Sequence, residues 1–151
     1  MALKPDRVEA LTDLSFFMNE TGERGVILTH SAAGSGASMD DNTATVIVST
    51  GTGDYPAGLL LNDVVNLDLT RQHINYAKDE VQKGGKVLLL RRGTVVTNKV
   101  ESSPVASIAA GSPAYFMSNG EITPDSGSAQ IGRFLSVKDA DGYVKVEIDI
   151  V

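Results

Sequence analysis

The chain has 151 residues, a formal net charge of −6 and no cysteine. This length fits one ordinary domain, and the lack of cysteine excludes thiol catalysis, thiolate metal sites and disulfide frameworks. The negative charge argues against a sequence-independent nucleic-acid binder, and since no run of about 18 apolar residues occurs, we expect no membrane span.

Apolar residues gather near the start of the chain, in the run VEALTDLSFFM. The residues at helical spacing in this run are Val8, Leu11, Leu14 and Met18. Because Phe17 lies beside that face, a short helix and an extended arm with apolar anchors both fit. The candidate partner-binding residues of this segment are Leu14, Phe16, Phe17 and Met18. Their side chains either hold a partner or close the open end of the protein's own core.

Two strand-like runs follow, GVILTH and TATVIVST, and the flexible loop AAGSGASMDDN separates them. After them the chain becomes more continuously apolar, beginning with YPAGLLLNDVVNLDL. We therefore expect residues 1–54 to form an N-terminal arm with an accessory β-segment, and residues 55–151 to form the main body.

One segment of this body has helical spacing, RQHINYAKDEVQK over residues 71–83. Ile74, Ala77 and Val81 share one face, and Gly84 with Gly85 follows where a C-terminal glycine cap falls. The spacing predicts a short helix over 71–83, although an ordered loop between strands fits the same residues.

Residues 55–100 are cationic, with seven basic and four acidic side chains, a balance of +3 in a chain of −6. Arg71, Arg91 and Arg92 are the candidates here for contact with an acidic partner surface. The alternative is that these side chains neutralise the chain's own acidic flanks, as mixed surface charges commonly do.

The C-terminal stretch IGRFLSVKDADGYVKVEIDIV alternates apolar and polar residues from Val144 to Ile150, which is typical of a half-buried strand. Before it, the acidic sequence DADG could be a calcium loop or a turn. A calcium loop of the EF-hand kind needs a glutamate at its twelfth position, and counting from Asp139 that position is Ile150. The pattern therefore predicts a hairpin turn at Asp139–Gly142.

Residues for chemistry are scarce. His30 and His73 are the only histidines, and no GxSxG elbow accompanies His30 and Ser31. The glycine-rich stretches GSGAS and GTGD lack the lysine of a phosphate loop. We therefore assign no catalytic, cofactor-binding or metal residue and expect a protein that is not an enzyme. The fold expected is mainly all-β, a small β-barrel or β-sandwich of jelly-roll or β-tulip type, with an N-terminal arm and at most one short helix.

The last third of the chain resembles the capsid decoration (cement) proteins of tailed bacteriophages. The residues that carry the resemblance are AGSPAY (110–115), the Asn119-Gly120 turn, Ile131-Gly132 and the terminal hairpin from Asp141 to Ile150. Residues 55–100 match that family's earlier strands loosely, and residues 1–54 match only as an accessory arm.

This resemblance implies a structural protein of the virion that is made in the host cytoplasm and placed on the capsid exterior. Its partners would be the major capsid protein and further copies of itself, as a homotrimer or, next, a dimer, with no cofactor, nucleic acid or membrane. Two other classes stay open: a carbohydrate- or partner-binding β-module of a virion, and a small β-barrel hydrolase.

Overall fold

The computed structural model describes residues 3–4, 6–31, 45–48, 55–65, 80–81, 86–104 and 106–150. These residues form strands, turns and irregular segments and contain no helix, so the predicted all-β class is confirmed. Accordingly, the described part of the chain offers no helix that could cross a bilayer.

Eleven strands are present along the described residues. They are β1 (Val8–Met18), β2 (Gly22–Glu23), β3 (Ile27–Ser31), β4 (Thr45–Val48), β5 (Pro56–Val65), β6 (Glu80–Val81), β7 (Lys86–Thr97), β8 (Pro113–Phe116), β9 (Ile122–Thr123), β10 (Gly132–Phe134) and β11 (Val144–Asp149). Nine of them form one mixed sheet in the order β1-β4-β3-β5-β7-β11-β10-β8-β9, while β2 pairs with β6.

Five strands of the large sheet form a partial ring. The pairings run from β1 through β4, β3 and β5 to β7, and β7 pairs again with β1. The contact between β1 and β4 is parallel and short, because it joins only Phe17 to Thr45 and Met18 to Val46. All other strand pairings of the ring are antiparallel.

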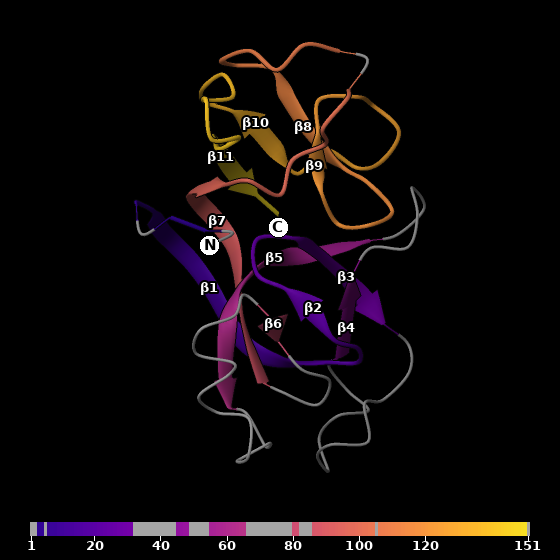
Figure 1. Ribbon diagram of the computed structural model, residues 1–151. Coiled ribbons are helices and arrows are strands. Elements are labelled where there is room, and N and C mark those ends of the chain that lie inside the picture. The colour runs from indigo at the N-terminus through magenta and orange to yellow at the C-terminus, as the bar shows by residue number, and fades with distance from the viewer. Residues whose placement is uncertain are drawn as a thin grey trace.

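The twelve-residue strand β7 connects the ring to the C-terminal strands (Figure 1). Its first half pairs with β5, from Lys86 to Leu90, and its second half pairs with β11, from Arg92 to Thr97. On its opposite edge β7 pairs with β1, from Val8 opposite Thr94 to Phe17 opposite Lys86. β7 thus fixes the position of β1 relative to both halves of the molecule.

Two apolar clusters form the core. Successive side chains of a strand point to opposite faces, so neighbours such as Leu59 and Leu60 enter different clusters. One cluster is shared with the C-terminal strands and contains the fully buried Phe134. The other cluster receives side chains from every strand of the ring. This burial on both faces explains why the runs GVIL, GLLL and VLLL are continuously apolar.

The predicted C-terminal hairpin is confirmed. β10 and β11 are antiparallel, and Val144, Val146 and Ile148 are buried as their alternation predicts. In the turn, the Asp139 N–H donates to the Tyr143 carbonyl at 3.0 Å, and the Gly142 N–H donates to the Asp139 carbonyl at 3.1 Å.

The N-terminal segment differs from the short-helix alternative. Residues 8–18 are a strand, because tertiary pairing with β7 prevails over the helical spacing of the side chains. Strands on both sides of the boundary expected after residue 54 pair directly, β3 with β5 and β1 with β7. Residues 1–54 therefore contribute strands to the same sheet as the body.

The predicted helix over 71–83 lies mostly outside the described residues. Its two described members, Glu80 and Val81, are strand β6 and pair with Glu23 and Gly22 of β2. The helix prediction is therefore wrong at these two positions. Val81 is fully buried in the core of the ring. The apolar side chain at this position therefore packs in the sheet and does not mark a helix face.

Candidate docking surface

Strand β1 carries three large apolar side chains that are open to solvent. The exposed fractions are 61% for Val8, 45% for Leu11 and 48% for Leu14. Only Tyr55 and Val137 are comparably exposed among the large apolar side chains of the described residues. We call Val8, Leu11 and Leu14 the β1 row. Exposed apolar surface gathered on one element is a candidate interaction site, whereas single scattered apolar residues need no explanation.

One edge of β1 is largely unpaired among the strands that the structure describes. β7 occupies one edge along most of the strand, and β4 reaches the other edge only at Phe17 and Met18. Within the strands that the structure describes, residues 8–16 have no partner on that second edge. An unpaired strand edge presents backbone N–H and C=O groups that can pair with another chain.

The register with β7 sets the row beside charged residues. Leu11 lies opposite Arg92, and Val8 lies opposite Thr94. The Arg92 Nε atom donates to Asp149 Oδ1 of β11 at 3.2 Å. One strand further along the sheet, Arg133 of β10 pairs with Glu147 at 2.7 Å. Val8 and Leu11 therefore lie beside a face on which β7, β10 and β11 carry cross-strand ion pairs.

The carboxylates within β1 are paired inside the chain. Glu9 forms an ion pair with Arg7 at 2.6 Å, and Asp13 lies 3.9 Å from Arg91. Partial burial of Asp13 raises its pKa, but hydrogen bonds from the hydroxyl and the N–H of Ser15, together with the Arg91 charge, outweigh this, so the pKa is lowered. Asp13 therefore stays ionised while it braces the exposed strand.

The seven residues predicted to bind a partner are placed differently. Leu14 is exposed, Phe16 is half-buried with its ring 5.5 Å from that of His30, and Phe17 lies under the Lys86 ammonium group at 5.8 Å. Met18 is fully buried in the ring core, where it presents no surface.

The structure brings two of the predicted arginines to the β1 row. Arg91 pairs with Asp13 of β1, and Arg92 lies opposite Leu11. Arg71 is outside the described residues. Val8 and Leu11 were missed as surface residues, although the spacing of three that they share with Leu14 is visible in the sequence. That spacing fits one face of a short helix as well as an extended arm, so the sequence alone does not show which of these side chains are exposed.

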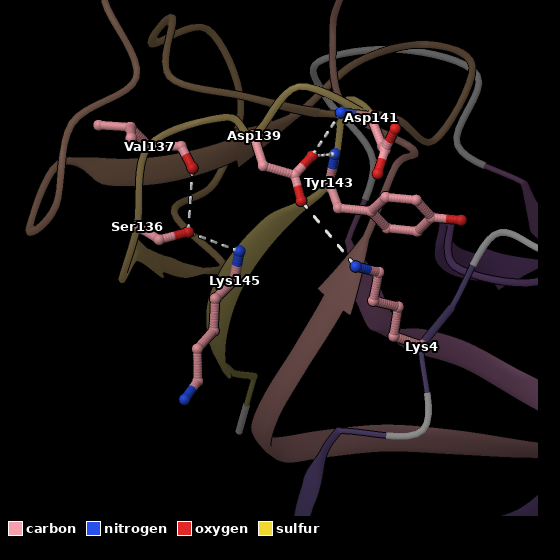
Figure 2. A network of polar contacts seen from close by, with 7 residues as sticks. All are labelled: Lys4, Ser136, Val137, Asp139, Asp141, Tyr143 and Lys145. Atoms are coloured by element: carbon pink, nitrogen blue, oxygen red, sulfur yellow. Dashed lines mark hydrogen bonds and ion pairs between the residues drawn. The ribbon is translucent and has the colours of Figure 1, made fainter.

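In the acidic turn, the Asp139 carboxylate forms hydrogen bonds and an ion pair within the chain (Figure 2). Asp139 Oδ1 accepts hydrogen bonds from the N–H groups of Asp141 at 3.0 Å and Tyr143 at 2.8 Å. Asp139 Oδ2 lies 3.9 Å from the Lys4 ammonium group, which also lies 4.5 Å from the centre of the Tyr143 ring. These contacts order the turn and fasten residue 4 beside it.

Other places for chemistry are few along the described chain. No group of three or more potential metal-ligating side chains is found there. An open hollow of about 390 Å³ is lined by Gln130, Gly132, Arg133, Glu147 and Asp149. The charged groups in this hollow pair across the strands. His30 is exposed at the end of β3, and His73 is outside the described residues.

Comparison of the chain with protein-family models and with curated proteins gives no match. The surface features that bear on function are the β1 row, the strand edge beside it and the paired charges around it.

Proposed function

We propose that this protein is a capsid decoration protein of a tailed bacteriophage. In this proposal it binds the outer surface of the phage head, bridges neighbouring major capsid subunits and stabilises the expanded capsid, without catalysing a reaction. The observation that carries the proposal is the exposed β1 row on a sheet-built body. The resemblance of residues 110–151 to that family supports it as well.

An exposed apolar surface such as the β1 row suits a protein that binds an assembled shell. A decoration protein binds the assembled shell and not free subunits, so it stabilises the shell by mass action. Copies held around a symmetry axis reinforce one another through effective concentration, so each single contact can be weak. We propose that the β1 row supplies a contact between each molecule and its neighbour on the shell. The expected association is symmetric, as a homotrimer or, next, a dimer.

The test uses expanded capsids that lack the protein. Purified protein should sediment with these capsids and raise the temperature at which they release DNA. Leu14→Arg should weaken capsid binding by more than about tenfold, because it places a desolvated charge in the contact. Val137→Arg is the matched control, since Val137 is 62% exposed in the loop between β10 and β11 and lies outside the row.

Two results would overturn the proposal. The wild-type protein could fail to sediment with capsids at any protein concentration, or it could bind them without raising the temperature of DNA release. Equal capsid binding by Leu14→Arg and Val137→Arg would remove the β1 row from the proposed contact.

A further inference from the structure

We infer that the β1 row is a two-fold interface, in which β1 of one molecule pairs antiparallel with β1 of a second copy. This inference rests on the self-association in the proposed function and assigns it a surface, a symmetry and a register. Antiparallel pairing of identical edge strands is isologous, since each strand contributes the same residues. It therefore selects the dimer.

The first support is the charge around the row. A chain with a net charge of −6 repels its own copy in general. Both carboxylates within β1, Glu9 and Asp13, are however neutralised by Arg7 and Arg91. Arg92, opposite Leu11, is likewise paired with Asp149. These pairs reduce the charge beside the row that would repel an identical surface or attract a strongly charged partner.

The second support is the symmetry of the apolar spacing. Val8 and Leu14 each lie three residues from Leu11. If Leu11 lies opposite the partner subunit's Leu11, then Val8 lies opposite the partner subunit's Leu14, and the reverse pair forms at the other end. Directly opposed apolar side chains are the units that stabilise an antiparallel pair. The same register sets Glu9 opposite the partner subunit's Asp13, and the arginines already paired with these carboxylates reduce the repulsion.

The third support is the length of open edge. Residues 8–16 have no described partner on the edge away from β7, and this stretch contains the whole row. β1 also has three register shifts against β7, between Glu9 and Leu11, between Leu11 and Thr12, and between Asp13 and Phe16. Such irregularities increase local twist and limit the length of a new ladder. The pairing is therefore short, and we expect a dimer that forms at high protein concentration.

The lack of cysteine allows a direct test of the register. Opposed residues of an antiparallel pair have Cα atoms about 4.5–5.5 Å apart, which is within the range for a disulfide. Under mild oxidation Leu11→Cys should crosslink with itself. Val8→Cys alone and Leu14→Cys alone should crosslink slowly, while a mixture of the two should crosslink as fast as Leu11→Cys. Val137→Cys is the control for random collision.

Light scattering provides an independent readout. The wild-type mass should rise with concentration from 15.9 kDa towards twice that value, and Leu11→Arg should raise the dissociation constant by more than about tenfold. The inference is overturned if Leu11→Cys crosslinks no faster than Val137→Cys, if the mass stays at that of a monomer, or if it reaches that of a trimer. These readouts involve no capsid, so a dimer that ignores capsids would refute only the proposed function.

Discussion

Gly93 controls how closely β1 approaches β7, and Gly93→Ala is the sharpest test of that packing. A Cβ atom at this position would lie 2.0 Å from the Val8 carbonyl oxygen, whereas Cβ contacts under 3.0 Å essentially never occur. The backbone of β1 would therefore have to move by about 3.0 − 2.0 = 1.0 Å. Overpacking costs about 1–3 kcal/mol, and the positive φ of 152° at Gly93 adds about 1 kcal/mol or more. We expect a loss of about 2–4 kcal/mol in the free energy of unfolding.

The assay is urea denaturation of Gly93→Ala beside Gly111→Ala. Gly111 also has a positive φ, of 89°, but no atom lies within 4 Å of a Cβ atom built there. Gly111→Ala thus carries only the conformational cost, about 1–2 kcal/mol. Equal losses in the two variants would refute the claim that β1 packs against Gly93. Since the shift also displaces the β1 row, Gly93→Ala should weaken self-association as well.

Three further predictions concern single side chains. Asp13→Asn should cost under about 1 kcal/mol at pH 7, as surface ion pairs do. Because the pKa of Asp13 is lowered in the fold, its stabilisation is fully present above the unfolded pKa of about 3.9 and is lost as the pH falls through the folded pKa. The difference from wild type in denaturation curves should vanish over that fall in pH. Phe134→Ala removes a fully buried ring; a loss of about 3–5 kcal/mol should lower the melting temperature by about 6–20 °C, and a smaller shift would contradict its central place in the core. Leu3→Ala should cost about 2–5 kcal/mol, because Leu3 is buried in the cluster shared with the C-terminal strands; an unchanged urea midpoint would show that residue 3 is not anchored there.

The C-terminal hairpin was predictable because its determinants are local. Val144, Val146 and Ile148 alternate within one strand, and the turn needs only Asp139 and Gly142 at their spacing. These signals survive folding because the strand keeps one face on the core and the other in solvent. No distant residue has to be known to recognise them.

The docking surface was less predictable because it depends on distant pairing. β1 pairs with β7 residues that lie 69 to 86 positions further along the chain, and that pairing decides that Leu11 lies opposite Arg92. The sequence places Leu14 and Met18 on one helical face, whereas the structure exposes Leu14 and buries Met18. Register shifts in β1 break the simple alternation by which a strand is recognised. The apolar spacing can be recognised in the sequence, but which of these side chains are exposed depends on the pairing of β1 with β7.

The strength expected of the β1 interface explains how it would serve a protein that acts on a lattice. Fully burying a Val or Leu side chain is worth about 1.5–3 kcal/mol, and about half of each side chain in the row is still exposed. Covering six of them in a dimer would therefore contribute about 5–9 kcal/mol. The loss of translational and rotational freedom on association costs about 4–15 kcal/mol, so free molecules pair weakly. On a capsid the shell already holds neighbouring copies close together, and much of that entropic cost is met by the lattice. A weak two-fold contact would thus form on the capsid and at high protein concentration, and would dissociate in dilute solution.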